Sequence, residues 1–230
     1  MNFVPITLPS HCVTYGIDAS TVCIRPLVGK DEEIIVQLGG ANTSKKIKSL
    51  FESVLQGIPD IGQITAGDVK HILLWEAINS YTPSYPINYI CSGCLHQQQV
   101  AADLNGVNSV ELPSDYSQPK RLKLSLGEVS LRLRTLQDEI NLAKYQEENS
   151  VSYLFSYAQC IVDSDMDIVQ RIEFLSDLPT KDLSLIRRFF VENDHGPDMK
   201  CVVHCVQCEN EEEIVVPFQF QNVLENATKS

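Results

Sequence analysis

The residues of this chain best suited to chemistry are two pairs of cysteines, each with the spacing C-x-x-C: Cys91 with Cys94, and Cys205 with Cys208. Two thiolates three positions apart on a tight turn between strands can occupy adjacent corners of a tetrahedron, while turn amides donate hydrogen bonds to the sulfurs. Two such turns, called zinc knuckles, supply the four thiolates of a closed structural zinc site. The sequence therefore predicts one structural zinc ion, bound by these four cysteines.

The segments around the two pairs resemble each other beyond the cysteines. YICSGCLHQQQVAADL begins at Tyr89 and VHCVQCENEEEIVVPF begins at Val203, and in both a polar stretch and then a short apolar run follow the knuckle. The two halves are separated by residues 95–204, whereas the cysteine pairs of an ordinary zinc ribbon lie about 15–20 residues apart. We therefore expect a zinc ribbon that is split by a long insertion.

Other interpretations of the cysteine pairs stay open at this point. They could be two redox pairs, two disulfides, or knuckles that have lost their metal. The redox interpretation fits poorly, because a thioredoxin-type C-x-x-C opens a helix, whereas loop and strand patterns follow both pairs here. Three further residues near the knuckles could replace a thiolate as ligand: Cys201, His204 and His96.

The opening of the chain and the lack of a membrane span indicate a reducing compartment, in which the remaining cysteines are expected to be reduced. Cys12, Cys23 and Cys160 are expected to be free thiols, the last two as small buried hydrophobic side chains. The opening MNFVPITLPS lacks the features of a signal peptide, and the sequence has no run of 18 apolar residues that could span a membrane. We expect a cytosolic protein with no membrane partner.

The charge balance and the motifs exclude several function classes. A net charge of −12 argues against nucleic-acid binding, which depends largely on neutralising phosphates. The chain contains no P-loop, H-E-x-x-H, G-x-S-x-G or G-x-G-x-x-G motif, and no catalytic residues are predicted. A calcium loop starting at Asp163 fails, because Ile168 and Phe174 stand where the loop needs Gly and Glu. We expect no enzymatic activity. The two basic clusters are expected to be solvated faces: Lys45, Lys46 and Lys48, then Lys120, Arg121 and Lys123.

Hydrophobic periodicity predicts an α+β fold that is mostly helical, with short antiparallel β-hairpins and the split zinc-ribbon-like site. Alternating apolar residues on both sides of Gly127 predict a hairpin over residues 122–133, with Arg132 and Arg134 facing solvent. Early helices are expected from Gly29, from residue 42 or 43 and from residue 65 or 68. Later helices are expected near residues 138–147, 151–162, 167–175 and 181–192, with Thr180 as the N-cap of the last.

These elements predict a division of the chain into five parts. Residues 1–20 are an extended arm, residues 21–88 a small strand with helices, and residues 136–198 an inserted helical lobe. Residues 89–135 and 199–217 form the knuckle and hairpin region, and residues 218–230 a C-terminal element and tail. In this interpretation the metal closes the base of the inserted lobe.

The order of these features resembles a known family. The arm Pro5-Ile6-Thr7-Leu8-Pro9-Ser10, the following Tyr15-Gly16, the run from Ile24 to Glu33, the helices and the early and late C-x-x-C resemble baseplate proteins of T4-type tailed bacteriophages, in particular the baseplate hub assembly proteins. The resemblance implies a non-enzymatic role in building the central hub of a contractile tail inside the host cytoplasm. It also implies other baseplate or hub proteins as partners, and residence in the virion tail if the protein is retained. The resemblance supplies no catalytic residues, and the zinc prediction rests on the cysteines alone.

A second interpretation is a zinc-ribbon adaptor that acts in transcription or binds nucleic acid. Zinc ribbons commonly serve in that way, but the acidic chain counts against it.

Overall fold

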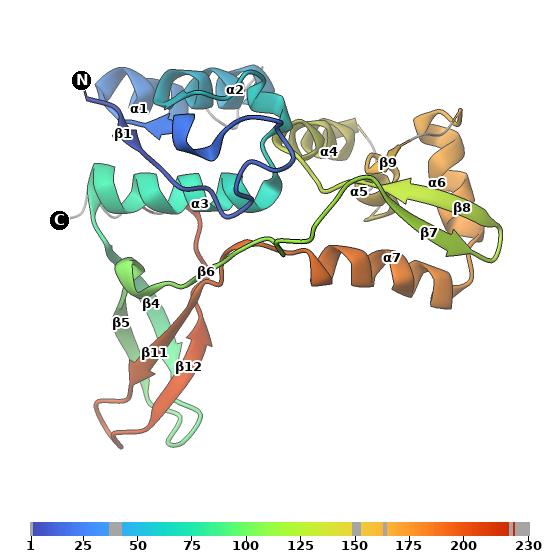
Figure 1. Ribbon diagram of the computed structural model, residues 1–230. Coiled ribbons are helices and arrows are strands. Elements are labelled where there is room, and N and C mark those ends of the chain that lie inside the picture. Colours follow the sequence, from blue (N-terminus) through green and yellow to red (C-terminus); the bar gives the residue numbers. More distant parts are fainter. Residues whose placement is uncertain (1, 37–42, 149–152, 163–164, 221–222, 224–230) are drawn as a thin grey trace.

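The computed structural model describes residues 2–36, 43–148, 153–162, 165–220 and 223. Two bodies that each combine helices with a small sheet lie side by side, and two long hairpins project from the first body as a stem (Figure 1). We call these parts the first body, the second body and the stem.

The first body is built by the early part of the chain. Three short antiparallel strands pair in the order β1-β2-β3, and helices α1, α2 and α3 pack around them. The Thr65 side chain accepts a hydrogen bond from the Asp68 amide and caps α3. The bounds are β1 Val4–Pro5, β2 Cys23–Ile24, α1 Gly29–Val36, α2 Thr43–Val54, β3 Leu55–Gln56, η2 Ile61–Gln63 and α3 Ala66–Glu76.

The second body repeats this composition with four helices. Strands β7 and β8 form the predicted hairpin, and β9 pairs with the other edge of β8 to give the order β7-β8-β9. The bounds are β7 Lys120–Leu124, β8 Gly127–Leu131, α4 Leu136–Glu148, α5 Tyr153–Ala158, β9 Ile161–Val162, α6 Ile168–Asp177 and α7 Thr180–Glu192.

The stem consists of the two hairpins that carry the knuckles. β4 (Ser84–Ile90) pairs with β5 (Gln97–Asp103), and β11 (Lys200–His204) pairs with β12 (Glu211–Val215). At the base of the stem, β6 (Ser109–Val110) pairs with β10 (Gly196–Pro197), which brings the segment after β5 beside the segment before β11. The π-helix η3 (Ala77–Tyr81) leads from α3 toward β4, and the 3-10 helix η4 (Leu104–Gly106) follows β5.

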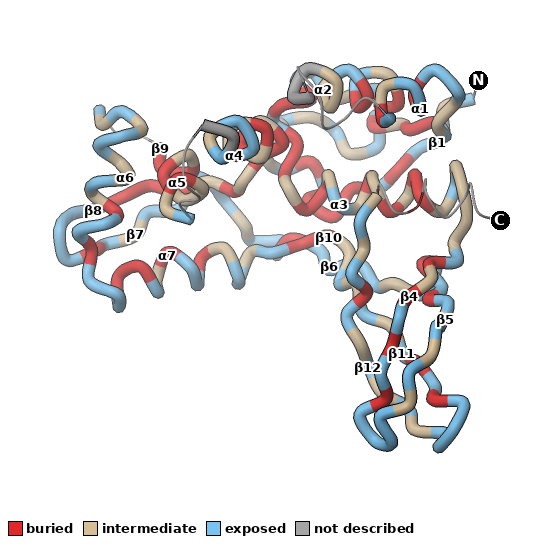
Figure 2. Tube along the Cα trace, turned by 180° about the vertical axis from the view of Figure 1, so that it is seen from behind, coloured by how far each residue is buried: buried red, intermediate tan, exposed pale blue. Residues whose placement is uncertain are grey.

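Each part has its own group of buried hydrophobic residues, as the red stretches of Figure 2 show. The first core is centred on residues such as Leu8, Ile24, Ile64 and Ile72, and it also receives Leu136 and Ile140 from α4. The second core is centred on Leu131, Ile161, Leu175 and Ile186. The base of the stem encloses Tyr85, Ala102, Leu104 and Val216, and its far end encloses Tyr89, Cys91, Val203 and Cys205.

The structure corrects three expectations about secondary structure. The fold is α+β, but "mostly helical" is wrong, because helices make up 41% and strands 24%. Residues 161–162 are not the end of a helix but the strand β9, because Ile161 and Val162 complete the edge of β8. The N-cap of α7 is Pro179, which has no side chain that can cap, and the helix begins at Thr180.

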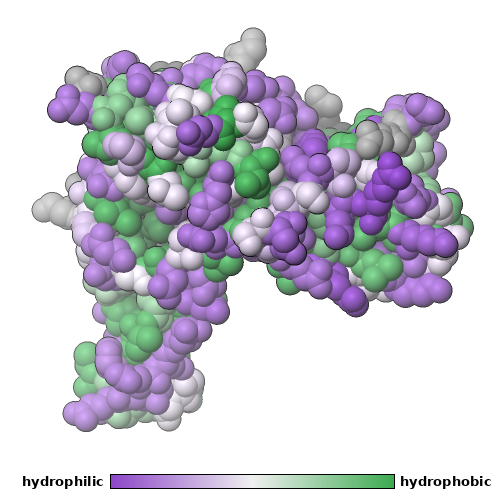
Figure 3. All heavy atoms as spheres, viewed as in Figure 1, coloured by the Kyte–Doolittle hydropathy of each residue, from purple (hydrophilic) through white to green (hydrophobic). Residues whose placement is uncertain are grey.

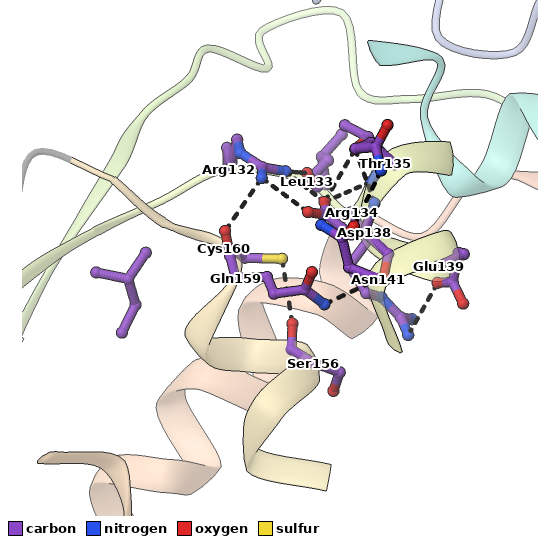
Figure 4. Close-up of polar contacts among 12 residues, drawn as sticks. Arg132, Leu133, Arg134, Thr135, Asp138, Glu139, Asn141, Ser156, Gln159 and Cys160 are labelled. Carbon is purple, nitrogen blue, oxygen red and sulfur yellow. Dashed lines mark hydrogen bonds and ion pairs between the residues drawn. The ribbon is translucent and has the colours of Figure 1, made fainter. Parts of the chain in front are cut away.

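Arg132 is also placed differently from the prediction. Its guanidinium is mostly buried and donates to both carboxylate oxygens of Asp138, at 2.5 and 2.9 Å, instead of facing solvent (Figure 4). Lys120, Arg121 and Lys123 are exposed, as expected for a solvated face. The division of the chain into an arm, an inserted lobe and a split knuckle region stays a prediction.

Candidate metal centre

The candidate metal centre lies at the far end of the stem, where both knuckles turn. Alternating residues of β4 and β11 point inward, so that Tyr89 and Val203 are buried between the hairpins while their neighbours Ile90 and His204 are exposed. This alternation fixes the register of each hairpin, because a slip by one residue would turn the buried side chains to solvent. The two knuckles therefore face each other.

Both knuckles have the same backbone geometry. The Cys91 amide donates to the carbonyl of His96 at 3.0 Å, and the Cys205 amide donates to the carbonyl of Asn210 at 2.9 Å. The residue after the second cysteine adopts a left-handed conformation in each, with φ of 60° at Leu95 and 58° at Glu209. These turns let two thiols of one hairpin point toward the other hairpin.

The four predicted cysteines are brought together. The sulfur atoms of Cys91, Cys94, Cys205 and Cys208 all lie within 4.8 Å of one another. Two pairs across the stem are closer, with Cys91 Sγ 3.6 Å from Cys208 Sγ and Cys94 Sγ 3.6 Å from Cys205 Sγ. A zinc ion with four ligands at about 2.3 Å needs sulfurs roughly 3.8 Å apart, whereas a disulfide needs about 2.05 Å. All eight cysteines are free thiols, and the spacing of these four fits a tetrahedral ion.

The protonation of the thiols shows why a cation would suit this site. Burial raises the pKa of Cys91, but hydrogen bonds from the Cys94 amide, Tyr89 and the Gly93 amide lower it to about 6. The Asn210 amide lowers the pKa of Cys208, but the neighbouring thiols raise it to about 12. The Cys94 pKa is also raised by burial and by the thiols of Cys205 and Cys91, against a hydrogen bond from the His96 amide. Cys91 therefore forms a thiolate readily, whereas Cys94 and Cys208 hold their protons more strongly, which a nearby cation would offset.

Polar side chains near the knuckles fasten one hairpin to the other, and the sequence alone did not single them out. Glu212 accepts hydrogen bonds from the Ser92 amide at 3.1 Å, from Ser92 Oγ at 2.6 Å and from the Tyr89 hydroxyl. Gln98 accepts from the Val206 amide at 3.0 Å and donates to the His204 carbonyl at 2.8 Å. Their matching positions in the overlaid knuckle segments are the signal that could have found them.

The three spare ligand candidates lie outside the group of four sulfurs. His204 Nδ1 lies 3.2 Å from a carboxylate oxygen of the exposed Glu211. Cys201 is half-buried on the inner side of β11, where its burial raises the pKa of the thiol. His96 contributes its backbone carbonyl to the first knuckle. Neither C-x-x-C opens a helix, since both connect the strands of a hairpin.

Each helix in the described part of the chain is too short or too polar to span a bilayer.

Comparison with known proteins identifies the family. No curated protein and no solved structure matches this chain. The family described as T4 bacteriophage base plate protein matches residues 9–225, which include the second body, the stem, all four cysteines of the candidate centre and the first body except β1 and the residues next to it. The resemblance drawn from the sequence is therefore confirmed at the level of the baseplate family. The chain belongs to the T4 bacteriophage base plate protein family.

Proposed function

We propose that this protein is a non-enzymatic structural or assembly protein of the central hub of a contractile tail baseplate. The observation that carries the proposal is the family match over residues 9–225. It works in the host cytoplasm during assembly and binds other baseplate or hub proteins. The acidic chain, with a net charge of −12, supports protein partners over nucleic acid.

The second part of the proposal is a structural zinc ion held by Cys91, Cys94, Cys205 and Cys208. The spacing of the four sulfurs and the all-thiolate donor set support zinc, which prefers such ligands in closed structural sites. A bound zinc ion would supply the positive charge that lets all four thiols deprotonate. The knuckle amides and the cross-stem hydrogen bonds hold the thiols in place, so that metal binding stabilises the stem.

The stem also offers a surface that suits protein partners. Several of its apolar side chains are exposed, and Figure 3 shows hydrophobic surface on the stem among hydrophilic residues. Exposed apolar patches rimmed by polar residues are typical of contact sites between proteins. The exposed apolar residues of the stem are Ile90, Leu95, Val202, Val206 and Val215.

Affinity purification of the tagged protein from infected cells tests this function. We expect baseplate or hub proteins to be captured, and Val206→Glu to reduce their recovery because it places a charge on the exposed tip. Val191→Glu is the matched control, since Val191 is about as exposed (75% against 80%) but lies on α7. Capture of polymerase or nucleic acid in place of tail proteins would overturn the proposal. Mass spectrometry of purified particles then distinguishes a retained component from an assembly factor.

A further inference from the structure

We propose that the chain contains two copies of one folding unit, residues 4–103 and residues 120–216. The four-cysteine centre is the joint between the copies, and each copy contributes one hairpin. The role of the metal in this joint rests on the proposed zinc site, whereas the repetition rests on the backbone and side-chain contacts of the two units.

The first sheet of each unit has the same pairing. In the first unit, Val4 and Pro5 pair with Ile24 and Cys23, which pair on their other side with Leu55 and Gln56. In the second unit, Lys120 and Arg121 pair with Leu131 and Ser130, which pair on their other side with Ile161 and Val162. Two helices lie between the second and third strands in both units: α1 and α2, then α4 and α5.

The corner after the second strand contains an arginine and an aspartate whose shared hydrogen bonds recur at matching positions in both units. Arg25 donates to the Pro26 carbonyl at 2.9 Å and to both carboxylate oxygens of Asp31, and Asp31 accepts from the Val28 amide. The Arg25 amide donates to Val54, the last residue before the third strand.

Figure 4 shows the second copy of this corner. Arg132 donates to the Leu133 carbonyl at 2.9 Å and to both oxygens of Asp138, and Asp138 accepts from the Thr135 amide. The Arg132 amide donates to Cys160, the last residue before the third strand. In both corners the arginine precedes its aspartate by six residues.

The helix that leads to the stem accepts an equivalent backbone hydrogen bond in each unit. Asp68 in the first turn of α3 accepts a hydrogen bond from the Ser10 amide at 3.0 Å. Asp182 in the first turn of α7 accepts one from the Ser125 amide at 2.7 Å. Each serine follows the first strand of its unit, so this contact joins matching elements. Buried apolar residues also correspond: Leu8 with Leu124, Ile64 with Leu178 and Ile72 with Ile186.

The two hairpins are related by exchange at the joint. Ile90 pairs with Gln97 and His204 pairs with Glu211, so the knuckles start and end at matching positions. Exchanging the hairpins turns the Cys91 to Cys208 contact into the Cys205 to Cys94 contact, and both measure 3.6 Å.

The polar contacts across the stem obey the same exchange. The Ser92 amide donates to Glu212 at 3.1 Å, and the Val206 amide donates to Gln98 at 3.0 Å. Ser92 directly follows Cys91, and Val206 directly follows Cys205. Their acceptors, Glu212 and Gln98, are each the second residue of the strand that leaves the opposite knuckle, β12 or β5. Such reciprocity is that of a two-fold interface, in which the same patch is used on both sides.

The units differ mainly in two places. The first unit has a long connection between its first two strands, where Tyr15 donates to Asp68, and the second has a tight turn. The second unit has the additional helix α6 before its Asp-bearing helix. Both differences lie before the Asp-bearing helix that leads to the stem, and the joint is the same in both units.

Matched alanine substitutions test the proposal in the full-length protein. Gln98→Ala and Glu212→Ala each remove the acceptor of one cross-stem amide, so we expect faster hydrogen exchange at Val206 in the first and at Ser92 in the second. Each should also weaken zinc binding by about tenfold, as loss of a group that orients metal ligands does. The outward-facing neighbours supply matched controls, Gln97→Ala and Glu211→Ala, which should change neither quantity. An effect of only one of the two test variants would overturn the repetition.

An alanine variant could fail because it loosens the whole stem. A second variant, in which the two knuckle segments are exchanged, tests the repetition independently of that outcome. In this chain residues 91–98 and 205–212 trade places, so that the thiol contacts and the two amide contacts to Gln98 and Glu212 are rebuilt with their partners reversed. The bond from the Tyr89 hydroxyl to Glu212 is lost, because Tyr89 lies outside the exchanged segments. We expect one zinc per chain and, with Co²⁺, the absorption of a four-thiolate tetrahedral site. A folded exchange chain that binds no Co²⁺ while the parent chain does would refute equivalence of the hairpins. If the parent chain itself binds no metal, the zinc proposal fails. The hydrogen-exchange rates of the Ser92 and Val206 amides in the alanine variants then still test whether the two units are repeats.

Discussion

Cys94 and Cys208 are the exposed pair of the sulfur cluster, whereas Cys91 and Cys205 are buried. Removing an exposed thiol takes away one proposed zinc ligand with little loss of packing, because the side chain already contacts solvent. The exposed pair therefore allows metal binding to be separated from stability of the core.

We expect Cys94→Ser to reduce zinc content from about one ion per chain to a small fraction of that value, since a structural site with three thiolates is incomplete. Elemental analysis of protein purified without chelator measures this. Cys201→Ser is the control, because Cys201 lies on the stem but outside the group of four sulfurs, and it should keep the metal. Equal zinc loss in both variants would contradict the assigned ligands.

Glu76 supplies a prediction about pH. Burial raises its pKa to about 7, although Ser80 donates a hydrogen bond to it at 2.6 Å and Arg25 lies near. The folded protein therefore favours the neutral acid, and this contribution to stability is present below about pH 4.5 and is lost as the pH rises through 7. Glu76→Gln mimics the neutral form.

At pH 8 we expect Glu76→Gln to raise the free energy of unfolding by roughly 1–3 kcal/mol, with little change at pH 4. Urea unfolding at the two pH values measures the difference. Glu52→Gln on the exposed side of α2 should change neither value. The same gain for Glu76→Gln at both pH values would show that the carboxylate charge is not the cause.

At the residue scale, the sequence predicted the cysteine cluster because C-x-x-C on a hairpin leaves the thiols few directions to point. It did not predict the roles of Glu212 and Gln98, because the overlay of the knuckle segments shows that their positions match but not which groups their side chains bind. Arg132 was predicted to face solvent because alternation along a strand places it opposite the apolar face. The strand ends at Leu131, however, and the chain turns there into the corner with Asp138.

At the scale of elements, the two arginine corners fix where the chain leaves the second strand of each sheet and enters the helix that follows it. A planar guanidinium can donate to two carboxylate oxygens and a carbonyl at once, whereas an ammonium group cannot reproduce that geometry. The carboxylates of Asp31 and Asp138 also accept backbone amides at the start of the helix, so each corner acts as a helix cap.

We expect Arg25→Lys and Arg132→Lys each to lower the free energy of unfolding by about 1–3 kcal/mol, because charge-assisted hydrogen bonds to a poorly solvated carboxylate are lost. Chemical unfolding of both variants measures this. Arg121→Lys is the control: its contact with Glu128 is 3.8 Å long and exposed, and exposed pairs contribute little. A loss in Arg121→Lys as large as in the corner variants would contradict the argument.

The helices were easier to predict than the strands for a physical reason. Periodic apolar residues extend over several turns in α2, α3, α6 and α7, whereas β1, β2, β3 and β9 have only two residues each. Two residues show no alternation, and Ile161 and Val162 continue the apolar pattern of the preceding helix. The repetition of the two units was hidden for the same reason, since it resides in pairing and in a few polar contacts.

At the scale of the whole molecule, metal binding should contribute to global stability, because the stem connects the segments that leave both bodies. We expect a strong chelator to lower Tm by roughly 5–15 °C and added Zn²⁺ to restore it, since a ligand bound only by the folded state stabilises it. Thermal unfolding followed by circular dichroism measures the shift. Cys94→Ser should show no response to chelator, and a shift of the same size in that variant would mean that the chelator acts elsewhere.

The cross-contacts at the base of the stem have a mechanical consequence. The hairpins are joined near the bodies by the pairing of β6 with β10 and by the Tyr85 hydroxyl, which donates to the Pro217 carbonyl at 3.1 Å. The knuckles join them again at the tip. Two hairpins that are joined at both ends form a closed loop of contacts. Such a pair resists separation and twisting far better than two hairpins of the same length that are joined only at the base. A lateral force applied at the tip is therefore transmitted to both bodies together, so the stem can serve as a rigid arm.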